Sequence, residues 1–248
     1  MVLGVFDSGL GGLTVLREII KNCSYDKVIY YGDTARLPYG DKDQDTLIRY
    51  AREDMDFLIE KGADEIVMAC GTICSNTLDE VKDEYPIRII GIIGVLCKEA
   101  LRKTVNKKIG VIATPATIRT KIFTKKMEGA DVYEIACKKF TPLIEKGMMD
   151  SDEMDEAIAE YISPLKEAHI DTQILGCTHY PLLMDKISEY LGYPVNFINS
   201  GVILAEEFNN GETKKPELEF YVSGDEEFFK EKAKTFLDIP EIEKVRKI

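Results

Sequence analysis

Short apolar runs alternate along this chain with longer stretches in which apolar residues recur at helical spacing. Runs of this kind at residues 2–6, 27–31 and 65–68 are each followed by a helix-like stretch, and the pattern resumes at residues 108–112. Strands that alternate with helices form parallel sheets, because each helix returns the chain across a face of the sheet before the next strand begins. The alternation therefore predicts an α/β fold.

The two halves of the chain repeat one pattern. Cys70 lies 66 positions after Gly4, and Cys177 lies 67 positions after Gly110. In both halves the predicted strand ends in a small residue and a cysteine, with a threonine one or two places on. Open α/β sheets bind ligands at the carboxyl ends of their strands. We therefore expect two pseudo-symmetric lobes, each a largely parallel sheet flanked by helices, with the active site in the cleft between them.

The first lobe is predicted over residues 1–94 plus 210–248, and the second over residues 95–209. The polar stretch at residues 209–216 lacks apolar periodicity and is the clearest linker. After this linker the sequence predicts one strand and one helix, which we expect to pack in the first lobe. Between the runs named above, strands are predicted at residues 87–93, 132–135, 172–175 and 195–198, and helices at about residues 46–60, just after Asn76, at about residues 116–127, at residues 152–168 and at residues 202–208.

Charge and composition limit the class of partner. The formal net charge of −12 and the isoelectric point near 4.8 argue against nucleic acid or an anionic membrane surface, because phosphate groups need a basic footprint. An acidic chain can still hold a locally positive pocket for a small anion. No run approaches the roughly 18 apolar residues of a membrane-spanning helix, and the N-terminus does not resemble a signal peptide. The expected compartment is the cytoplasm.

Cys177 is the first candidate for chemistry, since Thr178 and His179 follow it where a buried strand should end. A cysteine reacts as its thiolate, and a neighbouring histidine or helix N-terminus lowers the pKa of the thiol. The alternative, a buried thiol that only packs, suits this polar triplet less well. Cys70 becomes the second candidate through its equivalent place in the first half. The other cysteines are widely spaced, do not form a disulfide framework and are assigned to packing: Cys23, Cys74, Cys97 and Cys137.

Two cysteines that face each other across a cleft suit two opposed proton transfers at one carbon. One thiolate removes a proton from one face, and the opposite thiol delivers a proton to the other, so the configuration inverts. Removing a proton beside a carboxylate also requires donors for the negative charge that builds there. Hydroxyl and backbone donors are available where strands end and helices begin, at Ser8, Thr72, Thr114 and Thr178.

Asp7 and His179 could orient the thiols or relay protons beside them. For Asp7, a carboxylate that only caps a turn or helix is an equally good interpretation. For His179 we favour a role in the site, whereas His169, at the end of a predicted helix, is expected at the surface.

Two other kinds of site are possible. The glycine cluster at residues 9–12 suggests a nucleotide-binding turn, but the lysine of a P-loop and the acidic residue of a dinucleotide fingerprint are missing. Cys70, Cys74, Cys177 and His179 offer four potential zinc ligands, although their spacings fit structural zinc patterns poorly. We therefore expect no metal.

Three motifs resemble those of the glutamate racemases, a cofactor-independent group within the aspartate/glutamate racemase family. They are DSGLGGLTV at residues 7–15, YGDTARLPYG at residues 31–40 and LGCTHYPL at residues 175–182. The similarity extends from about residue 2 to about residue 208. It implies two α/β lobes, no cofactor, a small amino-acid substrate, a homodimer, and an isomerase that makes D-glutamate for the peptidoglycan of the cell wall.

The resemblance places the catalytic roles on Cys70 and Cys177, with Asp7 and His179 assisting. It implies substrate contacts at Ser8, Pro38, Tyr39, Gly40, Gly71, Thr72, Thr114, Thr117 and Thr178.

Gly71 departs from the family pattern, in which an asparagine follows the first cysteine and helps to hold the polar groups of the substrate. Losing a hydrogen bond to a substrate can change selectivity. Racemisation of glutamate is our first prediction. The second is a relative redirected to aspartate or another carboxylate, as a racemase, isomerase or decarboxylase. The third is a non-catalytic binding or regulatory homologue.

Overall fold

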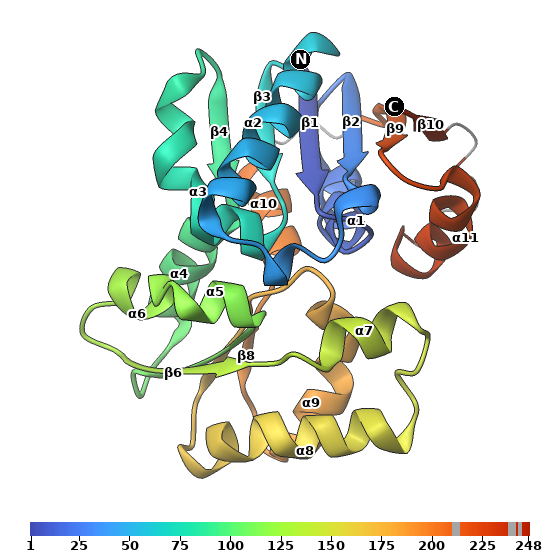
Figure 1. The fold of residues 1–248 in the computed structure, drawn as a ribbon. Coiled ribbons are helices and arrows are strands. Elements are labelled where there is room, and N and C mark those ends of the chain that lie inside the picture. Colours follow the sequence, from blue (N-terminus) through green and yellow to red (C-terminus); the bar gives the residue numbers. More distant parts are fainter. Residues whose placement is uncertain (210–213, 238–241, 243–244) are drawn as a thin grey trace.

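The computed structural model describes residues 1–209, 214–237, 242 and 245–248. Figure 1 shows two α/β lobes, one above the other. Within these residues one sheet has six strands and the other has four, and neighbouring strands pair in parallel. The predicted α/β fold with two largely parallel sheets is confirmed. In the same residues, no helix is both long and apolar enough to cross a bilayer.

The first sheet has the strand order β10-β9-β2-β1-β3-β4. Its central strands are buried along almost their whole length, which explains their mostly apolar sequences. The tail strand β9 pairs with β2, so the tail lies in this sheet. The strands are β1 (Val2–Asp7), β2 (Lys27–Gly32), β3 (Glu65–Met68), β4 (Arg88–Gly91), β9 (Glu217–Val222) and β10 (Val245–Lys247). The helical segments are α1 (Gly12–Asn22), η1 (Thr34–Arg36), η2 (Tyr39–Asp41), α2 (Gln44–Glu60), α3 (Gly71–Val81), η3 (Lys82–Glu84) and α11 (Glu226–Leu237).

The second sheet has the strand order β6-β5-β7-β8. Its strands are β5 (Lys108–Ala113), β6 (Asp131–Ala136), β7 (Thr172–Leu175) and β8 (Asn196–Ile198). The helical segments are α4 (Ile92–Lys103), α5 (Pro115–Arg119), α6 (Ile122–Lys126), α7 (Phe140–Glu145), α8 (Asp152–Glu167), η4 (Tyr180–Leu183), α9 (Met184–Leu191) and α10 (Ser200–Glu207). Strand β7 is buried throughout and delivers Cys177 two residues after its end. β5 and β7 thus repeat the relation of β1 and β3 in the first sheet.

Two element boundaries differ from the predictions. Helix α3 begins at Gly71 and not after Asn76. Polar side chains of this kind are common in turns, but here they bond to carbonyls one turn back inside the helix, as Thr77 Oγ1 does to Ile73 O at 2.7 Å. The predicted strand at 87–93 ends at Gly91, and its last two residues begin α4. A short apolar run has the same appearance in a strand and in a buried helix, so periodicity did not separate the two.

The predicted helix at residues 116–127 is two helices, α5 and α6. Lys121 separates them with a left-handed φ of 55°, which a continuous helix does not permit. Helices α4, α7 and α9 and the short strand β10 were not predicted. His169 is exposed, as predicted.

The lobes contact each other away from the cleft as well, since α10 packs against α1. The division at residues 94/95 and 209/210 stays a prediction. Residues 210–213 of the predicted linker lie outside the described part of the chain.

Candidate active site

A cavity of about 710 Å³ lies between the lobes, at the carboxyl ends of the strands of both sheets. Residues that follow β1, β3, β5, β6 and β7 all contribute to its lining. Parallel sheets place these ends at one edge, which is why residues far apart in sequence meet here. Both cysteines of the half-repeat line this one cavity.

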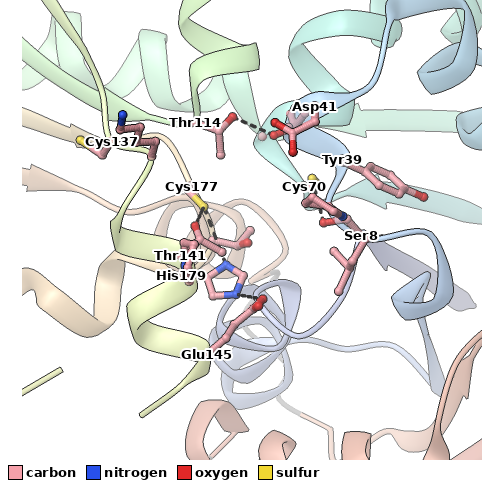
Figure 2. Close-up of a pocket in the computed structure, with 18 of the residues that line it drawn as sticks. Ser8, Tyr39, Asp41, Cys70, Thr114, Cys137, Thr141, Glu145, Cys177 and His179 are labelled. Atoms are coloured by element: carbon pink, nitrogen blue, oxygen red, sulfur yellow. Dashed lines mark hydrogen bonds and ion pairs between the residues drawn. The ribbon is translucent and has the colours of Figure 1, made fainter. Parts of the chain in front are cut away.

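Figure 2 shows Cys70 and Cys177 on facing sides of the pocket. Cys70 is the N-cap residue of α3, and its thiol donates a hydrogen bond to Ser8 Oγ at 3.5 Å. The sulfur of Cys177 lies 3.7 Å from Thr141 Oγ1 and 3.8 Å from His179 Nδ1. Cys70 is only 6% exposed and Cys177 only 8%, so each thiol is reached through the cavity and not from the open surface.

The two thiols have different electrostatic surroundings. Burial raises the pKa of Cys70 to about 12, and the nearby Asp7 carboxylate acts in the same direction, while the Ser8 hydroxyl opposes it. Burial also raises the pKa of Asp7, although His179 opposes that change. At neutral pH Cys70 is therefore a thiol, ready to donate a proton.

His179 links Cys177 to Glu145. Its Nε2 lies 3.0 Å from Glu145 Oε1, and this pair is drawn in Figure 2. Burial disfavours a charge on the ring, but the contacts with Cys177 and Glu145 together raise the pKa of His179 to about 10. The ring is then an imidazolium at neutral pH, with one N–H directed at the thiol of Cys177 and the other at Glu145.

Glu145 and Thr141 were not predicted as site residues. Both lie on α7, which was itself missed. The available signal was the helical spacing of Phe140, Leu143 and Ile144, which are the buried residues of this helix. That spacing would have predicted the helix, but not that Glu145 at its end meets a histidine 34 residues away.

Hydroxyl groups form a connected row along the cleft. Thr72 Oγ1 and Thr114 Oγ1 lie 2.8 Å apart and join the two lobes, and Thr114 Oγ1 lies 3.0 Å from Thr117 Oγ1. Thr117 is fully buried and does not line the cavity, so the structure places it behind Thr114. The residues of the predicted substrate set that do line the cavity are Ser8, Pro38, Tyr39, Gly40, Gly71, Thr72, Thr114 and Thr178.

Asp7 also lies behind the lining and not in it. Its carboxylate accepts hydrogen bonds from the backbone N–H of Gly9 at 2.9 Å and from the hydroxyl of Thr178 at 3.3 Å. These bonds orient two segments that border the cavity, one from each lobe. Both the turn-capping interpretation and a supporting role beside Cys70 are compatible with this position.

Pro38, Tyr39 and Gly40 line one part of the cavity, which we call the Tyr39 wall, and a charge network lies behind it. Arg36 pairs with Asp33, with Glu53 and with Asp54, the last at 2.7 Å. The Tyr39 hydroxyl donates to Asp33 and lies 3.3 Å from Asp54. Burial, and then the charge of Asp33, raise the pKa of Asp54 well above its ordinary value, and Arg36 opposes this. The network fixes the segment that carries Pro38, Tyr39 and Gly40.

The potential zinc ligands do not come together. Among the described residues, no group of three or more His, Cys, Asp and Glu side chains is placed to hold a metal ion. Cys74 is buried under Gly91, where a Cβ would lie 2.6 Å from its sulfur. It packs, as predicted. Cys137 was also assigned to packing, but it lines the cavity.

Comparison with known proteins gives this geometry a family. Residues 13–208 match the family model described as Asp/Glu/Hydantoin racemase. A glutamate racemase of Aquifex pyrophilus is 44% identical over 85% of this chain and 83% of its own length. The crystal structure of a glutamate racemase from Campylobacter jejuni is 35% identical, covers 97% of this chain and 100% of its own, and has a TM-score of 0.90.

The structure of a third relative was solved with a bound ligand. The crystal structure of a glutamate racemase from Francisella tularensis in complex with D-glutamate is 31% identical, covers 99% of this chain and 96% of its own, and has a TM-score of 0.88. The family model spans most of this chain, and these three relatives cover between 85% and 99% of it. The chain therefore belongs to the Asp/Glu/hydantoin racemase family.

Proposed function

We propose that this chain interconverts L- and D-glutamate, with Cys70 and Cys177 as the two opposed acid–base groups. The observation that carries the proposal is the placement of both cysteines on facing sides of one cavity. In one direction the thiolate of one cysteine takes the α-proton, and the electron pair is left on the substrate's α-carbon and carboxylate. The other thiol gives its proton to the opposite face of that carbon. In the reverse direction the roles exchange.

Each thiol has its own supporting groups. On the side of Cys177, the His179 imidazolium directs one N–H at the sulfur, and Glu145 holds the imidazole in place. On the side of Cys70, Ser8 accepts the thiol proton in a hydrogen bond, and Asp7 lies close enough to act on its pKa. No cofactor enters this scheme, because the two thiols supply both proton transfers.

The charge that builds on the substrate carboxylate needs donors fixed in advance. The hydroxyls of Thr72, Thr114 and Thr178 border the cavity, as does the N-terminal turn of α3, whose first N–H groups have no partner inside the helix. These donors take the place of a metal or cofactor in holding the carboxylate. Their position beside both thiols supports a substrate with its α-carbon between the two sulfurs.

The choice of glutamate is supported by the relatives, which are named glutamate racemases, and by the neighbour whose structure contains D-glutamate. We include in the proposal a homodimeric enzyme of the cytoplasm that supplies D-glutamate for peptidoglycan. Redirection to aspartate and a non-catalytic role have no specific observation in their favour.

Incubation of the protein with L- or D-glutamate, and in parallel with L- or D-aspartate, tests the proposal. In D2O, NMR follows loss of the α-proton, and chiral chromatography follows the enantiomers. We expect both glutamate enantiomers to converge on an equal mixture, with aspartate turned over much more slowly. If well-folded protein exchanges the α-proton of neither amino acid, the proposed function is wrong. Faster turnover of aspartate would reassign the substrate.

A further inference from the structure

The lining of the cavity carries three lysines in addition to its thiols and hydroxyls. They are Lys138, Lys146 and Lys232. Lys138 and Lys146 are exposed and Lys232 is half-buried, whereas both thiols of the lining are buried. This concentration of positive charge stands out in a chain with a net charge of −12. We call these three residues the lysine ring.

The lysines of the ring differ from the neighbouring Lys139 in their ion pairing. Within the described residues, none of the ring's members forms an ion pair, whereas the adjacent Lys139 pairs with Glu160. The lining also contains two acidic residues, Asp41 and Glu145, and Glu145 is bound to His179. Among the described residues, the lining therefore holds three lysines and one carboxylate, Asp41, that form no ion pair, and Lys232 also lies over the Phe228 ring at 6.0 Å.

The ring is contributed by both lobes. Lys138 and Lys146 lie on either side of α7 in the second lobe, and Lys232 lies on α11, which packs with α1 and β10 of the first. Figure 1 shows α7 and α11 on the same side of the molecule, one in each lobe. The cleft is thus bordered by positive charge from both lobes. Charges of one sign around a cleft with low-dielectric walls concentrate the field there and raise the local concentration of a ligand of opposite charge.

We propose that the lysine ring captures the anionic dicarboxylate substrate and leads it to the thiols, an inference that rests on the proposed function. Near neutral pH glutamate carries two carboxylates and one ammonium, so its net charge is −1. The ring attracts this charge outside the region where protons are transferred. Its contribution therefore falls on KM and kcat/KM, while kcat is set by the two thiols and their supporting groups.

The test compares two triple variants with the parent enzyme. The ring variant is Lys138→Gln, Lys146→Gln and Lys232→Gln. The control variant is Lys98→Gln, Lys125→Gln and Lys234→Gln, three exposed lysines outside the lining and without ion pairs in the described residues. Both variants become more negative by the same three charges. One unit charge about 10 Å from another in water changes an equilibrium constant by about 2-fold, so removing three changes it by about 8-fold.

Steady-state kinetics with L- and D-glutamate are measured between about 0.01 M and about 1 M salt, over which the Debye length falls from about 30 Å to about 3 Å. At low salt the ring variant should show a KM about 5- to 10-fold above the parent, with kcat within about 2-fold, and the difference should disappear at high salt. The control variant should match the parent. A ring variant with the KM and salt dependence of the parent, or one that loses kcat instead, overturns the inference. Absence of α-proton exchange by the parent would count against the proposed function and not against the ring.

Discussion

Gly71 and Gly176 meet across the cleft with no space for a side chain between them. A Cβ on Gly71 would lie 2.4 Å from the carbonyl oxygen of Gly176. Gly71 directly follows Cys70, and Gly176 directly precedes Cys177. The backbone contact between the lobes therefore lies beside both proposed catalytic thiols. The residue that departs from the family pattern is the one that this close approach requires.

Replacing Gly71 with asparagine should harm the enzyme. A Cβ so close to backbone must push the ends of β3 and β7 apart, and a shift of about 1 Å in a reacting group can cost on the order of 100-fold in rate. We expect Gly71→Asn and Gly71→Ala to lower kcat for both glutamate enantiomers by about 10- to 100-fold. Steady-state assays by chiral chromatography measure the change.

Gly94 provides the matched control, because no described residue beyond its chain neighbours and its own helix backbone lies within 4 Å of the position its Cβ would take. Gly94→Ala lies in α4 and should leave kcat unchanged while stabilising the helix slightly. If Gly71→Asn turns over glutamate faster than the parent, the contact with Gly176 does not require glycine at position 71. Gly71 then reflects only the loss of a substrate-binding side chain.

The Glu145–His179 pair should set the alkaline limit of activity. The pKa of His179, about 10, lies above its ordinary value of 6.5. The charged imidazole of His179 therefore contributes its full stabilisation of the fold below the ordinary pKa of histidine. This contribution is lost as the pH rises through about 10. Glu145→Gln removes one of the two contacts that raise the pKa. The alkaline limb of the kcat/KM profile, and the imidazole titration followed by NMR, should both move to lower pH.

Glu160→Gln is the control for that experiment, since it removes a carboxylate whose partner, Lys139, lies at the surface. Its pH profile should match the parent. If Glu145→Gln leaves the titration of His179 unchanged, Glu145 does not stabilise the charged form of the His179 imidazole.

Arg36 should be needed for the stability of the Tyr39 wall. Asp33 and Asp54 are both fully buried, so Arg36→Met leaves two buried carboxylates without their cation. Breaking a buried pair in this way costs about 3–5 kcal/mol of unfolding free energy. Because the pKa of Asp54 is raised by burial and by Asp33, protonation relieves the variant, and the loss should shrink as the pH falls. Urea unfolding at several pH values measures this.

A second substitution makes the Arg36 prediction specific. Adding Asp54→Asn removes one of the uncompensated charges and should recover part of the lost stability. If the network holds Pro38, Tyr39 and Gly40 in place, Arg36→Met should also raise KM, and adding Asp54→Asn should reverse part of that rise. Equal destabilisation by the single and double variants would show that the loss comes from the packing of the arginine side chain and not from the charges it leaves behind.

The positions of both cysteines could be predicted from the sequence for a physical reason. Central strands of parallel sheets are buried on both faces, so residues 66–68 of β3 and 174–175 of β7 form short apolar runs that end at one edge of each sheet. The half-repeat then placed Cys70 and Cys177 in equivalent positions. That both border one cavity follows from two similar lobes that face each other.

Glu145 and the lysine ring could not be predicted in the same way. A charged residue at the end of a short helix looks like any solvated side chain, and only the tertiary structure brings Glu145 to His179. Lys232 lies 94 residues after Lys138, on the opposite lobe. The start of α3 was not predicted because glycine, threonine, serine and asparagine favour turns in isolation, whereas here the side chains of Asn76 and Thr77 bond to carbonyls one turn back in the helix.

The most direct test of the two-thiol mechanism is the distribution of deuterium early in the reaction of L-glutamate in D2O. If two thiols act on opposite faces, the D-glutamate formed carries deuterium at its α-carbon while the remaining L-glutamate still carries hydrogen, and the reverse holds starting from D-glutamate. Cys70→Ser and Cys177→Ser should each abolish racemisation. Deuterium that enters substrate and product equally from the start, or full racemase activity in either serine variant, would contradict the account.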